Sequence, residues 1–162
     1  MSRGAGGALP ASAALAVRTS SVPGGRRRLE SVLKRLARLA ATRAGRAVEL
    51  SFALVDDVEM ADLHARYAGV EGPTDVLSFP LLEEPLLVGE VVISVDTARR
   101  EAAKRGHPAY DEVVLYAVHG VLHLLGEDDH DPVARRRMRR AERRTLAELG
   151  LPPVFLRRRS SS

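Results

Sequence analysis

The stretch AYDEVVLYAVHGVLHLLG, residues 109–126, predicts a long helix with apolar side chains on every side. A helix of this kind is buried, unlike a surface helix that keeps one polar face in water. Gly126 is expected to end it, because glycine readily adopts the left-handed backbone conformation that follows many helices. The sequence therefore places this helix at the centre of the fold.

The segments around this helix predict a sheet and further helices. Residues 48–55, VELSFALV, alternate larger apolar residues with smaller or polar ones, as in a strand with one buried face. Residues 26–45 repeat apolar residues at the spacing of an amphipathic helix. The other predicted strands are 14–20, 74–79 (ended by Pro80) and 86–95, and the other predicted helices are 58–69, 97–106 and 132–150. Their order predicts one α/β (α+β) domain in which about five helices pack on a small mixed four-stranded sheet.

The chain length of 162 residues is sufficient for one domain with a real core. We expect a disordered leader over residues 1–11, a single domain over residues 12–152 and a basic flexible tail over residues 153–162. No apolar run approaches the roughly 20 residues of a transmembrane helix, and the lack of cysteine excludes disulfides and thiolate metal sites. We therefore predict a cytoplasmic protein with no membrane partner.

Positive charge is concentrated in the last part of the chain. Residues 1–132 carry 15 Lys or Arg and 19 Asp or Glu, whereas residues 133–162 carry 10 Arg and 2 Glu. Arginine suits bidentate contacts with phosphate groups, and a dense arginine surface attracts RNA without regard to sequence. A solvated arginine face explains the same pattern equally well. The candidate RNA contacts in this region are Arg135, Arg136 and Arg139.

Two histidines of the central helix predict a metal site. His119 and His123 lie four residues apart, so both project from one face of the helix, among apolar neighbours. A buried imidazole needs a partner for each ring nitrogen, and one divalent ion serves both side chains. After Gly126 the chain can turn back, so that Asp129 or His130 offers a third ligand. Three protein ligands with an open position describe a catalytic zinc site, although nitrogen and oxygen ligands also permit nickel, manganese or iron.

The run HGVLHLLGEDDH, residues 119–130, resembles the H-G-x-L-H-L-x-G-x-D-H signature of the YbeY family, which are metal-dependent endoribonucleases of ribosomal RNA maturation. Two further blocks are similar to the family, PTDVLSFP at residues 73–80 and VGEVVISVDTARREAAKRGH at residues 88–107. The resemblance covers roughly residues 48–150. It implies a single-strand-specific, zinc-dependent endoribonuclease with one zinc ion per chain. It further implies small-subunit RNA 3′ end maturation and ribosome quality control, with ribosomal RNA and the ribosome or its small subunit as partners.

The chain departs from the family pattern at two places. Without gaps, the third ligand of the family falls on Asp129, one residue before His130. Either a residue has been inserted and His130 is the ligand, or Asp129 has replaced the histidine; the ungapped register favours Asp129. The second departure is Ala68, which follows Tyr67 where the family usually carries arginine. Arg66, one step away, is therefore a further candidate RNA contact.

The residues leave alternatives to the nuclease interpretation. Gly120 stands where H-E-x-x-H metallopeptidases carry their glutamate general base, so that base is missing. Whichever of Asp128 and Asp129 does not bind the metal can orient water, and Asp128 is the catalytic candidate. A metallopeptidase-like hydrolase that uses either aspartate, and a non-catalytic ribosome-assembly factor with a structural metal, are the two alternatives.

Several polar residues near these motifs have an ordinary structural explanation. Asp128 and Asp131 can cap the helix that begins near Pro132. Thr74, Asp75 and Ser78 are expected to bond to neighbouring backbone, although the resemblance implies that they line the cleft. The remaining histidines, His64 and His107, are interpreted as surface or packing residues.

Overall fold

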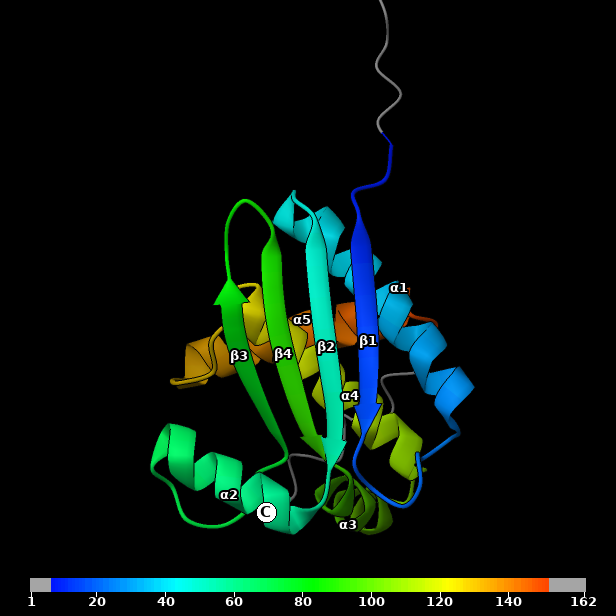
Figure 1. Cartoon of the computed structure of the whole chain (residues 1–162), viewed down its shortest axis with the longest axis vertical. Coiled ribbons are helices and arrows are strands. Elements are labelled where there is room, and N and C mark those ends of the chain that lie inside the picture. Colours follow the sequence, from blue (N-terminus) through cyan, green and yellow to red (C-terminus); the bar gives the residue numbers. More distant parts are fainter. Residues whose placement is uncertain (1–6, 152–162) are drawn as a thin grey trace, which may run out of the picture.

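Four strands form one mixed sheet in the computed structural model, which describes residues 7–151 (Figure 1). Its order is β1 (Ala11–Val17), β2 (Val48–Val55), β4 (Leu87–Ser94) and β3 (Val76–Leu82). The first three strands are parallel, and β3 pairs with β4 in the antiparallel direction at the edge. The predicted α/β class with a small mixed four-stranded sheet is confirmed.

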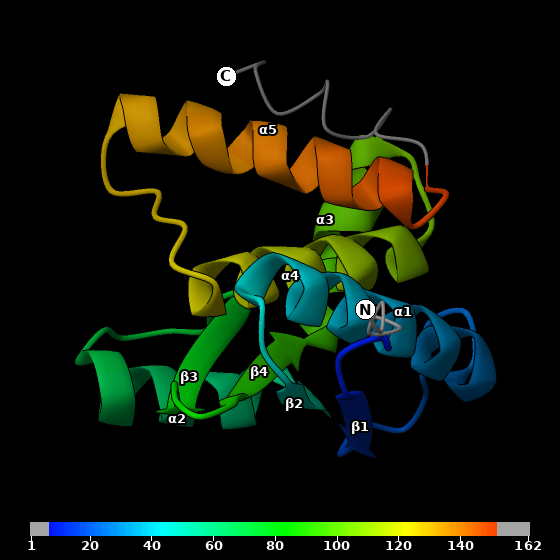
Figure 2. The same ribbon diagram turned by 90° about the horizontal axis from the view of Figure 1, so that it is seen from above.

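Five helices pack on this sheet in layers. The helices α1 (Arg26–Ala44) and α4 (Ala109–Leu124) cover one face, and α5 (Pro132–Glu148) packs on α4 as an outer layer (Figure 2). On the other face, α2 (Asp57–Ala68) contacts β4. The helix α3 (Val95–Arg105) follows β4 and packs against α4. Among residues 7–151, no helix is long and apolar enough to span a membrane.

The helix α4 is the centre of the core, as predicted. No residue from 112 to 118 is more than 2% exposed, because α1, α3, α5 and the sheet surround this part of the helix. Two buried side chains, Tyr116 and Leu115, are among the largest of the core. Burial on this scale supplies most of the free energy of folding. The two histidines of α4 therefore stand on the most firmly packed element of the domain.

Polar caps define the starts of three helices, including the cap at Asp131 that the sequence predicted. Asp56 accepts a hydrogen bond from the Glu59 amide at the start of α2. Ser94 serves α3 by accepting from the Thr97 amide, and Asp131 serves α5 by accepting from the Ala134 amide. Such caps satisfy amides that have no partner within the helix.

The predicted end of β3 at Pro80 is wrong, since the strand continues to Leu82. Proline lacks an amide donor, but β3 is an edge strand and its register shifts between Pro80 and Leu82. Proline is tolerated in a sheet on an edge strand and at an irregularity of this kind. The first strand begins earlier than predicted, at Ala11, a residue of the expected leader. Residues 1–6 of the expected leader and the expected tail at 153–162 lie outside the described residues.

Candidate metal centre

His119 and His123 face each other on the last turns of α4. Their Nε2 atoms are 3.0 Å apart, and their rings meet edge to face with centroids 4.6 Å apart. The side chains are 20% and 30% exposed, respectively. The one-turn spacing therefore brings two nitrogen donors to a single point that solvent reaches.

The loop after α4 brings Asp129 to the two imidazoles. Gly126, with φ of 98°, turns the chain out of the helix. The Asp129 carboxylate oxygens then lie 3.5 Å from His119 Nε2 and 3.7 Å from His123 Nε2. One donor atom from each of the three residues falls within 4.8 Å of the others. Two nitrogens and one carboxylate oxygen suit zinc, so the donor chemistry fits the ion predicted from sequence.

His130 points away from the imidazole pair. Its side chain is 85% exposed, and its Nε2 lies 3.2 Å from Asp128 Oδ1. Asp128 also accepts hydrogen bonds from the amides of Asp129 and His130, at 2.6 and 3.1 Å. Asp128 thus holds the shape of the loop that presents Asp129, and it forms a second acidic group with Asp129 and His130. Of the two predicted third ligands, the one next to His119 and His123 is Asp129.

Glu142 of α5 is a partner of the site that sequence reasoning missed. Its side chain is 1% exposed, and its Oε1 lies 2.7 Å from His119 Nδ1, which donates to it. Burial disfavours the imidazolium, but the hydrogen bond and charge of Glu142, with the charges of Asp75 and Asp129, outweigh it and raise the pKa of His119. The bond fixes the ring so that Nε2 faces His123, as carboxylates behind metal-bound histidines do.

A cleft of about 520 Å³ opens beside this cluster. It is lined by α2, the segment before β3, β3, α4 and the ligand loop, with lining residues His64, Thr74, Asp75, Val76, Leu77, Ser78, His119, His123, Asp129 and His130. None of the lining residues is Arg or Lys. The cleft lies in the size range of small-molecule sites, and the candidate metal centre forms one of its walls.

Gly120 packs the histidine helix directly against the sheet. A Cβ atom at this position would lie 2.6 Å from Val91 Cγ1 and 2.9 Å from Ser78 Oγ. The Ser78 hydroxyl donates to the carbonyl of Gly120 at 2.8 Å. Position 120 therefore faces β3 and β4 at a distance that excludes a glutamate side chain, in agreement with the absence of a peptidase base.

The predicted RNA-contacting arginines lie on the surface and do not line the cleft. Arg66 is exposed on α2 and pairs with Asp62 at 3.3 Å. Arg135, Arg136 and Arg139 are exposed on α5, and none forms a hydrogen bond or ion pair with any residue from 7 to 151. The inward side of α5 buries Met138 and Leu146 together with the polar Glu142 and Thr145, and Leu149 is buried just after the helix.

The residues that were given structural explanations divide into two groups. Thr74 and Asp75 make local bonds, whereas Ser78 bonds to the carbonyl of Gly120 on α4, and all three line the cleft. His64 lines the cleft as well, although its sequence context gave no sign of this. His107 is a packing residue, since its Nε2 lies 2.7 Å from the buried carboxylate of Glu112.

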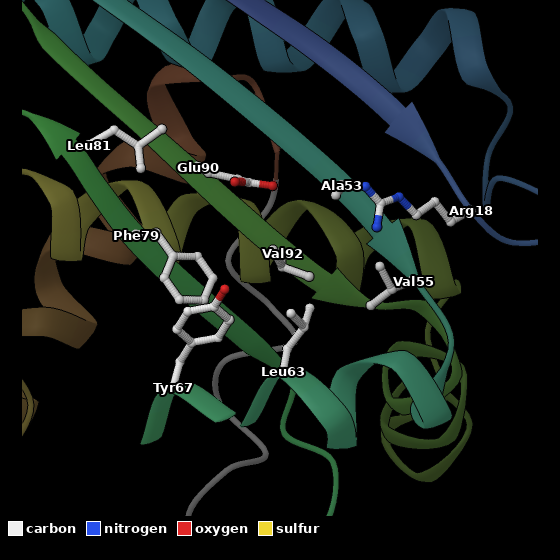
Figure 3. A pocket seen from close by; sticks show the side chains of 9 residues that line it. All are labelled: Arg18, Ala53, Val55, Leu63, Tyr67, Phe79, Leu81, Glu90 and Val92. Carbon is white, nitrogen blue, oxygen red and sulfur yellow. The ribbon is translucent and has the colours of Figure 1, made fainter. Parts of the chain in front are cut away.

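A second pocket, of about 290 Å³, lies between α2 and the face of the sheet opposite α4 (Figure 3). Its walls are mainly apolar, and Tyr67 meets Phe79 there edge to face, with ring centroids 5.1 Å apart. Arg18 and Glu90 are the charged residues of its lining. Within residues 7–151, the groups suited to hold a metal ion lie at the cleft instead.

Three comparisons relate this chain to known proteins. Residues 17–150 match the family model described as Endoribonuclease YbeY. Proteins named Endoribonuclease YbeY are 45% identical in Thermobifida fusca (130 residues, 73% of this chain and 84% of that protein) and 40% identical in Carboxydothermus hydrogenoformans (125 residues, 76% and 87%). The solution structure of TM1509 from Thermotoga maritima is similar in fold, with a TM-score of 0.58 and 22% identity over 85% of this chain and 91% of that one.

Proposed function

This chain belongs to the YbeY family of endoribonucleases, and on that premise we propose that it is a zinc-dependent endoribonuclease specific for single-stranded RNA. Its role in this proposal is ribosomal RNA processing, including 3′ end maturation of the small-subunit RNA and ribosome quality control. The ribosome or its small subunit is the proposed partner, in the cytoplasm. The observation that carries the catalytic part is the meeting of His119, His123 and Asp129 donors within 4.8 Å at the cleft.

The residues around the cluster have different roles in the proposed hydrolytic site. His119, His123 and Asp129 would hold one zinc ion, which supplies a Lewis acid and lowers the pKa of water to about 7. Glu142 positions His119 from behind. Asp128 shapes the ligand loop through its Oδ1 atom, and no residue from 7 to 151 bonds its Oδ2. We retain Asp128 as the group that orients water through that second oxygen.

The arginines of α5 provide the attraction for RNA that the cleft lining lacks. Arg135, Arg136 and Arg139 are exposed and form no hydrogen bond or ion pair with the described residues, so their charges are available to phosphates. Counterion release makes such binding weaken steeply with salt. Replacing the three by glutamine should weaken RNA binding uniformly across sequences and flatten its salt dependence. The same three changes should leave zinc content unchanged.

The central experiment separates this proposal from its alternatives. Purified protein is incubated with single-stranded RNA and with casein, each with and without a chelator. Chelator-sensitive cleavage of RNA alone supports the nuclease. Chelator-sensitive proteolysis without RNA cleavage would establish the peptidase that uses Asp128 or Asp129. Metal-replete protein that never cuts RNA, and that melts on chelation, would establish a non-catalytic assembly factor.

Zinc stoichiometry tests the third ligand. Asp129→Ala should lose more zinc than His130→Ala, because the Asp129 carboxylate is the one beside both imidazoles, whereas His130 is mostly exposed. The reverse ordering would mean that His130 binds the ion and that the loop contains an inserted residue.

A further inference from the structure

One wall of the cleft consists of hydrogen-bond acceptors, and the lining of the cleft contains no arginine or lysine. This acceptor wall is formed by the side chains of His64, Thr74, Asp75 and Ser78. It matters for the proposed RNA substrate, because a wall's free donors and acceptors decide which chemical groups it can bind. The bonds within the wall show which of its atoms remain free.

The hydrogens of the acceptor wall are already committed to protein partners. The Ser78 hydroxyl donates to the Gly120 carbonyl at 2.8 Å, and the Thr74 hydroxyl donates to Asp75 Oδ1 at 3.3 Å. Each hydroxyl oxygen can still accept. The second oxygen of Asp75 can only accept as well, since an ionised carboxylate has no donor. The wall therefore offers lone pairs, and no polar hydrogen, from these three residues.

His64 adds an acceptor nitrogen of fixed orientation. Its Nδ1 lies 2.9 Å from the carbonyl oxygen of Gly72, and a carbonyl can only accept, so Nδ1 carries the hydrogen. In the neutral imidazole Nε2 is then an acceptor. No residue from 7 to 151 bonds this Nε2, although His64 lines the cleft. The tautomer is thus set by the backbone of the loop after α2.

The chemistry of the wall selects one part of an RNA chain. Phosphodiester oxygens only accept hydrogen bonds, and the charge of Asp75 repels them. The ribose 2′-hydroxyl is a donor that occurs at every RNA nucleotide and is missing from DNA. We infer that His64 Nε2, within the acceptor wall, accepts a hydrogen bond from a ribose 2′-hydroxyl beside the cleaved phosphodiester and so makes the cleft discriminate RNA from DNA. The inference rests on the proposed nuclease function.

His64 can be changed with little risk to the fold. It is on α2, outside the core around α4, and its bonded partner is a loop carbonyl. His64→Phe keeps an aromatic ring and removes the acceptor. His64→Gln restores an amide that can donate to Gly72 and accept from the ligand. Val58→Ala, at a 79% exposed position of the same helix, is the matched control.

The test is a double-mutant cycle that combines a substitution at His64 with a change at one ribose of the RNA. Cleavage (kcat/KM) is measured on an RNA oligonucleotide and on versions with one 2′-deoxy or 2′-fluoro ribose at each position near the cut. For the natural chain and Val58→Ala, one such position should lower kcat/KM about 3- to 10-fold, the effect of losing one hydrogen bond. His64→Phe should show the same loss on full RNA and no further loss at that position, whereas His64→Gln should recover most of it. Zinc content should stay constant.

Two results would overturn the inference. In the first, the losses in kcat/KM caused by His64→Phe and by the modified ribose multiply when combined. In the second, His64→Phe is as active on RNA, and as selective for the 2′-hydroxyl, as the natural chain. Complete loss of cleavage by one 2′-deoxy ribose would overturn it too, because the hydroxyl would then take part in the reaction itself. If the natural chain does not cut RNA, the proposed function fails separately. The contact between His64 and the 2′-hydroxyl is then tested by binding RNA and DNA oligonucleotides of one sequence to zinc-depleted protein. A preference for RNA that His64→Phe abolishes supports the contact, and equal binding of RNA and DNA refutes it.

Discussion

Replacing Glu142 by glutamine removes a negative charge behind His119 and keeps the shape of the side chain. Glu142 is 1% exposed, and its Oε1 accepts from His119 Nδ1 at 2.7 Å. Glutamine can accept the same hydrogen bond through its amide oxygen. The change therefore isolates the contribution of the charge from that of the packing.

The magnitude follows from the kind of bond. A hydrogen bond to a charged group contributes about 1.5–3 kcal/mol, and a neutral one about 0.5–1.5 kcal/mol. The difference is about 1–1.5 kcal/mol, or roughly tenfold in an equilibrium constant. Loss of a carboxylate behind a metal-bound histidine typically costs 10- to 100-fold in metal affinity, which is about the same size or larger. We expect Glu142→Gln to bind zinc about tenfold more weakly.

A competition titration with a fluorescent zinc chelator measures this difference. Glu148→Gln is the control, since Glu148 lies on the same helix but is 41% exposed and pairs with Arg43. The gap should be largest at pH 8, where protons compete least with zinc for His119. It should narrow toward pH 6, because Glu142 raises the pKa of His119 and protons then compete with zinc more in the natural chain. Equal affinities at pH 8, with both proteins binding zinc, would refute the positioning role.

Three further changes test the fold that holds the site. Gly120→Ala places a Cβ within 2.6 Å of Val91, and this overpacking should cost about 1–3 kcal/mol. Alanine regains about 1 kcal/mol because it favours the helix more than glycine does, so Tm should fall by a few degrees. An unchanged Tm would show that the sheet moves to make room for the methyl group. Ser94→Ala removes a buried cap and a bond to Asp57, and should cost about 1–3 kcal/mol in urea unfolding; a cost below 0.5 kcal/mol by that measure would contradict it. The Arg100 hydrogen bond lowers the pKa of Asp57 below 3.8, so its stabilisation is present above that pH and lost as pH falls through the lowered pKa. Asp57→Asn should therefore be less stable at pH 7 and lose less stability on acidification, and parallel stability curves for the two proteins would disprove the linkage.

Local signals predicted most of the elements and the juxtaposition of His119 and His123. The spacing of His119 and His123 is a property of the helix itself, so the sequence alone brings them together. The all-apolar pattern around them correctly predicted the burial of α4. Pro80 predicted the wrong end for β3, because an edge strand tolerates proline and the order of strands in the sheet is not contained in the local sequence.

Contacts between distant segments could not be predicted in this way. Glu142 carried one signal, since it lies four residues from both Met138 and Leu146 on the inward side of α5, where a charged residue needs a partner. Nothing in the sequence names His119 as that partner. His64 gave no signal at all, because its place in the cleft depends on how α2 meets the segment before β3.

The burial of α4 has a consequence for how this protein tolerates heat and mutation. Segments that open easily are those with few apolar contacts, and α4 has the most complete burial of any helix described here. Two of the three candidate metal ligands thus stand on the helix whose amide hydrogens should exchange last. Inactivation on warming should therefore accompany global unfolding and should not precede it. A substitution that weakens the core far from the cleft should lower the temperatures of unfolding and of inactivation together.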